Sequence, residues 1–360
     1  MNGMGKGFKV KTISQTLLSP KRERERDHFL RMLGKEERKK AFVENGSVFL
    51  EKLIASCNSR SIPIRSFSIE ELLKATNNFD PHLLFREDGS YQWYNGSLEC
   101  RLISVKKYRK IGYAKERDFP FTDMVTCAKM CAHKNVLKLI GCCLETPSPV
   151  LVYESAENGT LSDRIFASKP QARPMPWQFK LKVAREIAHA IAYLHTAFSK
   201  PIIHRDIKPQ NIFFDQHGIP KLSDFSISVA IPEGEFEVED DILGAYGFLC
   251  PRYAVTGVVT EKSDVYSFGS LLLEVVTGKT LTDLYETTSG FTNLEDYIRT
   301  NIVKKILESA IQAGEGEAGL EQQLQASLQL ALICRDENPE FRPTMIDVTK
   351  ELRRIERSIP

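Results

Sequence analysis

The chain of 360 residues is 42% hydrophobic and carries a formal net charge of +2 at neutral pH. This length and apolar content suffice for one two-lobed domain with an extension, and so small a net charge argues against a dedicated nucleic-acid binder. The eight cysteines show no spacing typical of a zinc site, which favours reduced structural thiols. Because the apolar runs are too short to span a bilayer and the N-terminus lacks a signal-peptide core, we expect no transmembrane segment.

Two segments precede the expected core domain. Residues 1–20 show no hydrophobic periodicity, and we expect them to be disordered. Residues 21–65 are predicted to form a helical extension, in which the alternating charges of Lys21–Lys40 suit a solvent-facing helix or, as the alternative, a basic surface for a partner or lipid. After the turn residues Asn45 and Gly46, helical spacing predicts an apolar face that packs on the core domain, formed by Phe49, Leu50, Leu53, Ile54 and Cys57.

From residue 66 the pattern changes to short strands followed by long helices. A helix is predicted over Phe67–Phe79, because Ser68 can cap it and Glu71 follows three residues later. Strand-like runs then predict a small, mostly antiparallel sheet, at Tyr91–Tyr94, Leu98–Tyr108, Leu137–Cys143 and Pro149–Glu154. Later helices are predicted over Leu181–Leu194, Ser263–Val276 and Leu324–Cys334, with an exposed loop at Gln312–Glu321.

The most specific string is Ile202–Asn211, in which Asp206 follows His-Arg and precedes Lys208 and Asn211 at fixed offsets. This pattern is typical of the catalytic loop of protein kinases. In that chemistry the Asp accepts the proton of the attacking hydroxyl, the Lys steadies the transferred phosphoryl group and the Asn holds Mg²⁺. The candidate catalytic residues are therefore Asp206, Lys208 and Asn211.

Residues 66–356 resemble a protein kinase domain as a whole. The resemblance implies an α+β, two-lobed fold, with a small, mainly antiparallel β N-lobe carrying one helix at about 66–154 and a larger helical C-lobe at about 159–356. The N-terminal helical extension is added to these lobes. The resemblance also implies that Glu154 and Ala156 contact a nucleotide, and that Asp224, in Asp-Phe-Ser where the family has Asp-Phe-Gly, binds Mg²⁺ together with Asn211.

Lys106, which ends Ile103–Lys106, matches the lysine that contacts the phosphates of ATP in the family while paired with a Glu on the next helix. Counting back from His133–Val136 places that Glu at Met124, which carries no charge. We therefore expect Lys106 to lack its usual partner. The alternative is that the count slips by one residue, in which case Asp123 restores an acidic partner.

The glycine-rich loop that covers the phosphates in kinases is degenerate in this chain. Its three glycine positions fall on Arg86, Asp88 and Tyr91, and its valine position falls on Trp93. Side chains thus stand where backbone amides should approach phosphate, and Trp93 with Phe213 would crowd the base. ATP and Mg²⁺ are the implied cofactors, but we expect their binding to be weak or absent.

The segment Leu222–Pro251 departs from that of an active kinase. It has no Thr to be phosphorylated. We therefore expect Arg205, which binds an activating phosphate elsewhere in the family, to have little to bind. Just beyond it, Arg252 replaces the Glu that pairs with a buried Arg342, so we expect two guanidinium groups to face each other unless an acidic side chain is recruited. Seven acids and no Lys or Arg, interleaved with apolar residues, favour an ordered docking segment, with a solvated loop as the alternative.

Within the kinases, the chain resembles the zed-related (ZRK) group of plant receptor-like cytoplasmic kinases, which are wall-associated-kinase-like. Phe42–Ser47, the degenerate glycine loop and Asp-Phe-Ser carry this likeness. It implies a catalytically impaired kinase-fold adaptor in plant immunity, which links a coiled-coil nucleotide-binding leucine-rich-repeat receptor to a pathogen effector or an effector-modified receptor-like cytoplasmic kinase. The implied location is the cytoplasm, with plasma-membrane association only through partners.

Two other functions stay open. The complete catalytic loop is compatible with an active, atypical ATP-dependent serine/threonine kinase that uses Asp206 as the base and Lys106 on the phosphates. The other is a switch that binds ATP without transferring phosphate. Met124 and the lost glycines favour the adaptor, whereas the retained Asp206 favours the kinase.

Overall fold

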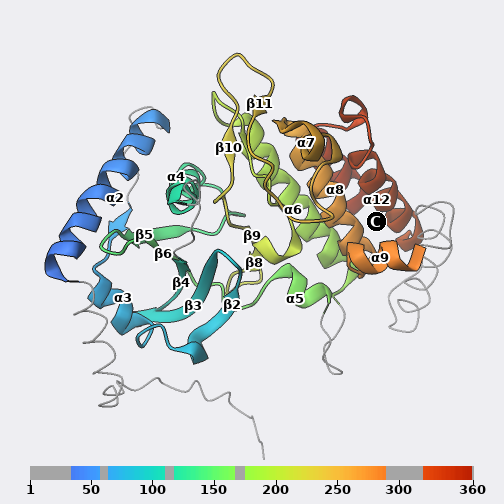
Figure 1. The fold of residues 1–360 in the computed structure, drawn as a ribbon. Helices are drawn as coiled ribbons and strands as arrows, with labels where there is room; N and C mark the ends of the chain where they lie inside the picture. The colour runs from blue at the N-terminus through green and yellow to red at the C-terminus, as the bar shows by residue number, and fades with distance from the viewer. Residues whose placement is uncertain (1–33, 57–63, 110–116, 167–174, 289–318, 359–360) are drawn as a thin grey trace, which may run out of the picture.

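The computed structural model describes residues 34–56, 64–109, 117–166, 175–288 and 319–358 (Figure 1). The segment 1–20, the first part of the charged segment Lys21–Lys40 and most of the loop predicted at Gln312–Glu321 lie outside these residues. Within them, a sheet-rich N-lobe and a larger helical C-lobe lie side by side, with α2 at the outer edge of the N-lobe (Figure 1). The predicted two-lobed α+β kinase fold is confirmed.

The N-lobe sheet has six strands in the order β1-β5-β6-β4-β3-β2. β1 runs parallel to β5, and the other neighbouring pairs are antiparallel. The strands are β1 (Arg65–Ser66), β2 (Leu84–Glu87), β3 (Tyr91–Leu98), β4 (Arg101–Tyr108), β5 (Leu139–Cys143) and β6 (Val150–Glu154). The β3–β4 register places Trp93 opposite Lys106, which brings the altered glycine-loop strand onto the lysine strand.

The helix α3 (Ile69–Ala75) begins with the predicted cap. The Ser68 hydroxyl accepts a hydrogen bond from the Glu71 backbone at 3.2 Å, and the Glu71 carboxylate accepts one from the Ser68 backbone at 2.8 Å. The helix ends at Ala75, before the predicted Phe79, because Asn77, Asn78 and Phe79 take the left-handed conformation with φ of 50°, 64° and 54°. The other N-lobe helices are α4 (Phe119–Lys129) and the short η1 (Pro81–Leu83).

The C-lobe is built around α8, which is buried from Ser263 to Thr277. Its Gly269 lies so close to α12 that an added Cβ would be 2.8 Å from the Ala331 carbonyl oxygen. The helices are α5 (Leu161–Ile165), α6 (Trp177–Thr196), α7 (Pro251–Thr256), α8 (Glu261–Thr277), α9 (Leu281–Thr288), α12 (Leu320–Cys334) and α13 (Met345–Glu356), with η3 (Pro209–Asn211) and η5 (Pro339–Phe341). The three small ribbons pair β7 (Ile202–Ile203) with β10 (Val229–Ala230), β8 (Ile212–Phe214) with β9 (Pro220–Leu222), and β11 (Val238–Glu239) with β12 (Val258–Val259).

In the described part of the chain, no helix is both long and apolar enough to cross a membrane. Seven cysteines fall within the same residues, and all seven are free thiols.

The extension differs from its prediction, because α2 (Lys35–Ser56) runs unbroken through the predicted turn at Asn45 and Gly46. The Asn45 side chain is buried and donates hydrogen bonds to the carbonyl oxygens of Leu144 and Thr146, both at 2.9 Å. These bonds fasten the middle of α2 to the chain that follows β5. Tertiary contacts therefore override the low helix propensity of Asn-Gly.

The predicted apolar face of α2 is only partly buried. Phe49 packs against the main hydrophobic core, together with Val48, which the sequence did not single out. Leu50 and Ile54, however, are 58% and 72% exposed, so the prediction that they pack on the domain is wrong. Val43, which helical spacing places on the same face of α2, is also exposed. Cys57 lies outside the described residues.

The anchor at Asn45 can be tested by replacing Asn45 with Ala. The substitution leaves two buried carbonyl oxygens without their donor, which typically costs about 1–3 kcal/mol. We expect the free energy of unfolding in urea to fall by that amount. The control is Glu44→Ala, on an exposed neighbouring position, where we expect a change within about 0.5 kcal/mol. Equal stability of the two variants would show that Asn45 does not anchor α2.

Candidate functional site

Asp264 of α8 holds the catalytic loop in place. The Asp264 carboxylate accepts hydrogen bonds from the backbone N–H groups of His204 at 2.8 Å and Arg205 at 2.9 Å. Burial alone would raise the pKa of Asp264, but its hydrogen bond with the His195 ring and the bonds at His204 lower it. The charged carboxylate thus fixes Arg205 in its left-handed conformation, with φ of 68°.

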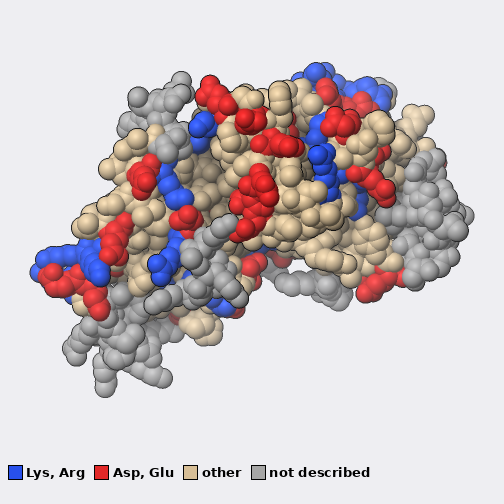
Figure 2. All heavy atoms as spheres, turned by 45° about the horizontal axis from the view of Figure 1, so that its top comes forward, with Lys and Arg blue, Asp and Glu red and all other residues tan. Residues whose placement is uncertain are grey.

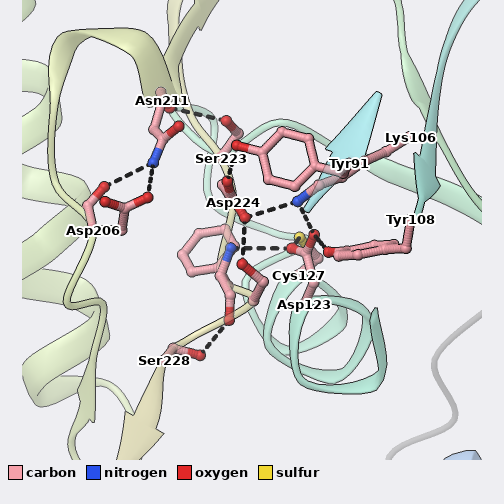
Figure 3. A network of polar contacts seen from close by, with 12 residues as sticks. Tyr91, Lys106, Tyr108, Asp123, Cys127, Asp206, Asn211, Ser223, Asp224 and Ser228 are labelled. Atoms are coloured by element: carbon pink, nitrogen blue, oxygen red, sulfur yellow. Dashed lines mark hydrogen bonds and ion pairs between the residues drawn. The ribbon is translucent and has the colours of Figure 1, made fainter. Parts of the chain in front are cut away.

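Asp206, Lys208 and Asn211 come together as the sequence predicts. Lys208 lies 2.8 Å from the Asp206 carboxylate. The Asn211 side chain donates to the Asp206 carboxylate at 2.7 Å and to its backbone carbonyl at 2.8 Å (Figure 3). The side-chain oxygen of Asn211, however, accepts a hydrogen bond at 2.9 Å from Arg86 of β2. Arg86, which stands at a glycine position of the family's loop, therefore bonds to the Asn211 oxygen that would bind Mg²⁺ in an active kinase.

Lys106 has an acidic partner, which corrects the expectation that it has none. Its ammonium lies 2.8 Å from Asp123 and 2.7 Å from Asp224, and none of the three side chains is more than 3% exposed (Figure 3). Met124 is buried in the apolar core. The count along α4 was therefore one residue too far, and the alternative with Asp123 is the correct one. Burial alone would lower the pKa of Lys106, but the two carboxylates raise it.

Aromatic rings enclose this ammonium. Lys106 Nζ lies 4.1 Å from the ring centre of Tyr91 and 4.8 Å from that of Tyr108, and Trp93 is next at 5.7 Å. The Tyr91 hydroxyl donates to Asp224 at 2.5 Å, and the Tyr108 hydroxyl donates to Asp123 at 2.7 Å. Lys106 has no exposed surface, so it cannot meet a phosphate without rearrangement of these rings.

The Asp224 carboxylate accepts hydrogen bonds from three side chains of the protein itself. Besides Lys106 and Tyr91, it accepts a hydrogen bond at 2.6 Å from Ser226, the residue that replaces the glycine of Asp-Phe-Gly. Burial alone would raise the pKa of Asp224, but the Lys106 ammonium and the two hydroxyls lower it, so the carboxylate stays charged. Its backbone φ is 65°, a strained value for a residue with a side chain.

The space expected for the base is occupied by aromatic side chains. Trp93 is 1% exposed, and its ring centre lies 5.2 Å from that of Phe213 and 5.1 Å from that of Tyr153. The structure thus agrees with the predicted crowding between Trp93 and Phe213. Phe85 of β2 adds a third contact, with its ring centre 6.2 Å from both Trp93 and Phe213.

The two residues expected to contact a nucleotide next to this space are also engaged. An alanine can offer a ligand only its backbone groups, and the Ala156 N–H donates to the Ser104 hydroxyl at 3.0 Å. The Glu154 carboxylate forms an ion pair with Lys221 at 3.1 Å. Neither Ser104 nor Lys221 could be recognised from the sequence, because nothing in the spacing along the chain brings them to β6.

These contacts decide whether the residues present fit Mg²⁺. A hard divalent cation needs free oxygen ligands. The side-chain oxygen of Asn211 accepts from Arg86, and the Asp224 carboxylate accepts from three donors. Among the described residues, moreover, no group of three or more His, Cys, Asp or Glu side chains is placed to hold a metal. Asn211 and Asp224, arranged as they are, do not fit the ion.

The segment after Asp224 contradicts the expectation that Arg205 has little to grip. Arg205 forms an ion pair with Asp240 at 3.0 Å and donates to the backbone carbonyl of Ile227 at 2.5 Å. One of the seven acids of this segment therefore occupies the position where the family binds a phosphate. The β11–β12 ribbon supports the pairing, because it places Asp240 directly after β11.

Arg252 and Arg342 do not face each other, so that expectation is wrong. Arg252 is exposed at the start of α7, whereas Arg342 is 1% exposed. Among the described residues, no acidic side chain is paired with Arg342. Its guanidinium donates to the Cys250 sulfur at 3.0 Å, and to the backbone carbonyls of Asp336 at 2.7 Å and Lys262 at 3.0 Å. It also lies 5.1 Å from the ring centre of Tyr266, so neutral acceptors and a ring replace the carboxylate.

The comparisons with known proteins agree with this geometry. Residues 89–352 match the family described as protein tyrosine and serine/threonine kinase. The serine/threonine-protein kinase ZRK1 of Arabidopsis thaliana is 41% identical over 90% of this chain and 95% of its own length. The non-functional pseudokinases ZRK2 and ZED1 of the same plant are 38% and 39% identical, over 96% and 88% of this chain and 97% and 96% of their own lengths. The chain therefore belongs to the protein kinase family and, within it, to the zed-related group of kinases and pseudokinases.

Proposed function

We propose that this protein is a catalytically impaired, kinase-fold adaptor. The proposal rests on one observation, which is that side chains of the protein itself bond to the residues that would bind the metal. Arg86 donates a hydrogen bond to Asn211, and Tyr91 and Lys106 donate to Asp224. Phosphoryl transfer depends on positioning and on metal ions that neutralise charge, and here the groups that would do both are bound to the chain itself. The non-functional pseudokinases among its relatives support the same conclusion.

The partner proposed for this adaptor is a coiled-coil nucleotide-binding leucine-rich-repeat immune receptor, together with a pathogen effector or an effector-modified receptor-like cytoplasmic kinase. Two surfaces suit such contacts. One is the outward side of α2, where Leu50 and Ile54 are exposed. The other is the β10–β11 connection, at the top of Figure 1, where Phe236 is 89% exposed among acids. Acidic side chains gather in the upper middle of the face that Figure 2 brings forward.

An active, atypical serine/threonine kinase is the second candidate. It is favoured by one observation, the arrangement of Asp206 with Lys208 at 2.8 Å and Asn211 at 2.7 Å. The same contacts also have a purely structural role, because they join Asp206 to Asn211 across the catalytic loop. The kinase ZRK1 among its relatives keeps this candidate open for experiment.

Phosphoryl transfer by the purified protein distinguishes the two candidates. With labelled ATP and Mg²⁺ or Mn²⁺, we expect incorporation at least about 10²-fold below that of an ordinary kinase, since even small misplacements cost that much. Asp206→Ala should give the same background as wild type. Strong labelling of the wild type that disappears in Asp206→Ala would instead establish the active kinase.

ATP binding can be followed separately by thermal unfolding. A ligand present at 100 times its Kd stabilises a protein by about 2.7 kcal/mol, which is readily seen as a shift in Tm. We expect no such shift with millimolar ATP, either with Mg²⁺ or with a chelator, because rings fill the base site and Ser104 occupies the Ala156 N–H. A rise of several degrees would show that a nucleotide displaces these groups.

The acidic β10–β11 connection is tested by reversing three of its exposed acids, Glu233, Glu235 and Glu237, to Lys. Asp240 is left unchanged, because its ion pair with Arg205 holds the segment. We expect weaker co-purification with the receptor or the modified kinase and loss of its salt dependence, with an unchanged Tm.

A matched control reverses three exposed acids elsewhere in the chain, Glu157, Glu321 and Glu337, and so makes the same change in net charge. This control should bind like the wild type. If both triple variants bind equally well, the connection is a solvated loop and the exposed side of α2 becomes the docking candidate.

A further inference from the structure

Arg86 connects the two lobes at the position where the family holds a metal ion. It lies on β2 of the N-lobe, and its Nη2 donates to the side-chain oxygen of Asn211 in the catalytic loop at 2.9 Å. Its guanidinium carbon also lies 5.6 Å from the ring centre of Phe213, on the floor of the base site. The side chain thus reaches from β2 of the N-lobe to Asn211 and Phe213 of the C-lobe.

The charges around this position show why a cation belongs there. Three carboxylates lie in this region, those of Asp123, Asp206 and Asp224 (Figure 3). Within the described residues, two ammonium groups, Lys106 and Lys208, are paired with them. One negative charge remains, and the Arg86 guanidinium balances it. In an ordinary kinase a divalent metal neutralises charge at this place.

The placement of Arg86 is not that of a freely solvated surface arginine. Its Nη1 is buried and has no hydrogen-bond partner among the residues that the structure describes, so this nitrogen gives up hydration in this position. Such desolvation is unfavourable unless nearby charge offsets it. The surplus carboxylate charge beside Asn211 supplies that compensation.

We propose that Arg86 is a tethered cation that takes the place of a divalent metal ion and holds β2 against the catalytic loop without any ligand. The closed arrangement of the lobes is then built into the chain. Removing the guanidinium frees the side-chain oxygen of Asn211 next to the Asp206 carboxylate and leaves a net negative charge there, and oxygen donors with negative charge are what hard divalent cations prefer. This inference rests on the contacts at Arg86 and does not depend on the adaptor role.

The test compares Arg86→Ala with Arg109→Ala in the full-length protein. Arg109 is the matched control, because it follows β4 of the same sheet and forms an ion pair with Glu87 at the surface. In a chelating buffer, we expect Arg86→Ala to melt several degrees below Arg109→Ala. Millimolar Mn²⁺ without nucleotide should restore most of this loss, and should leave the wild type and Arg109→Ala unchanged.

Binding of Mn²⁺ itself is measured by electron paramagnetic resonance. We expect Arg86→Ala to bind Mn²⁺ at least tenfold more tightly than the wild type, and Arg86→Ala combined with Asn211→Ala to lose this gain. The proposal fails if the Arg86→Ala and Arg109→Ala variants respond alike to Mn²⁺. It fails equally if the wild type already binds Mn²⁺ as tightly as Arg86→Ala, whether or not the wild type transfers phosphate.

Should Arg86→Ala not fold, Arg86→Gln replaces it, because glutamine removes the charge and keeps an amide donor on a shorter side chain. Mn²⁺ binding by Arg86→Gln supports the tethered cation. A Gln variant that matches the wild type in both Tm and Mn²⁺ response would show that the hydrogen bond matters and the charge does not, which overturns the proposal.

Discussion

The buried ammonium of Lys106 is the interaction on which the rest of the structure depends. It joins three separate parts of the chain: β4, which carries it, α4 through Asp123, and the segment after β9 through Asp224. Removing one partner of such a buried group typically costs about 3–5 kcal/mol, because it leaves a charge unpaired. The Phe225 N–H also donates to Asp123 at 3.1 Å, so the same carboxylate positions the strained turn at Asp224. The two lobes therefore meet around this charge, which is paired with Asp123 of the N-lobe and Asp224 of the C-lobe.

Near that charge, side chains of this protein lie at the positions where other kinases bind the nucleotide base, the metal ion and the activating phosphate. Trp93 and Phe213 fill the base site, Arg86 stands at the metal position, and Asp240 meets Arg205 where an activating phosphate would bind. Each substitution alone would weaken an enzyme. Together they join the two lobes without a ligand, so the proposed impairment of catalysis and the contacts between the lobes have the same cause.

The parts of the site that could be predicted are those fixed by local spacing. The cap of Ser68 and Glu71 and the grouping of Asp206, Lys208 and Asn211 follow from offsets of a few residues, which local geometry preserves. The partner of Lys106 was misplaced, because a one-residue error in counting turns a helix by about 100° and exchanges Asp123 for Met124. The contacts of Arg86, Ser104 and Asp240 could not be predicted at all, since each joins residues that are distant in sequence. Long polar side chains in place of glycines were nevertheless a sign that the loop had acquired contacts of its own.

The same contacts also bear on the proposed docking role of the segment after Asp224. A segment that is fixed at its base loses less conformational entropy on binding than a free loop. The segment after Asp224 is fixed in this way, because Ile231 is 1% exposed in the core and Asp240 is paired with Arg205. Between these two anchors Phe236 stays almost fully exposed. In a kinase, phosphate and nucleotide would have to order this region first, whereas here the order comes from contacts within the chain, which under the proposed adaptor role leaves Phe236 ready for a partner without a nucleotide.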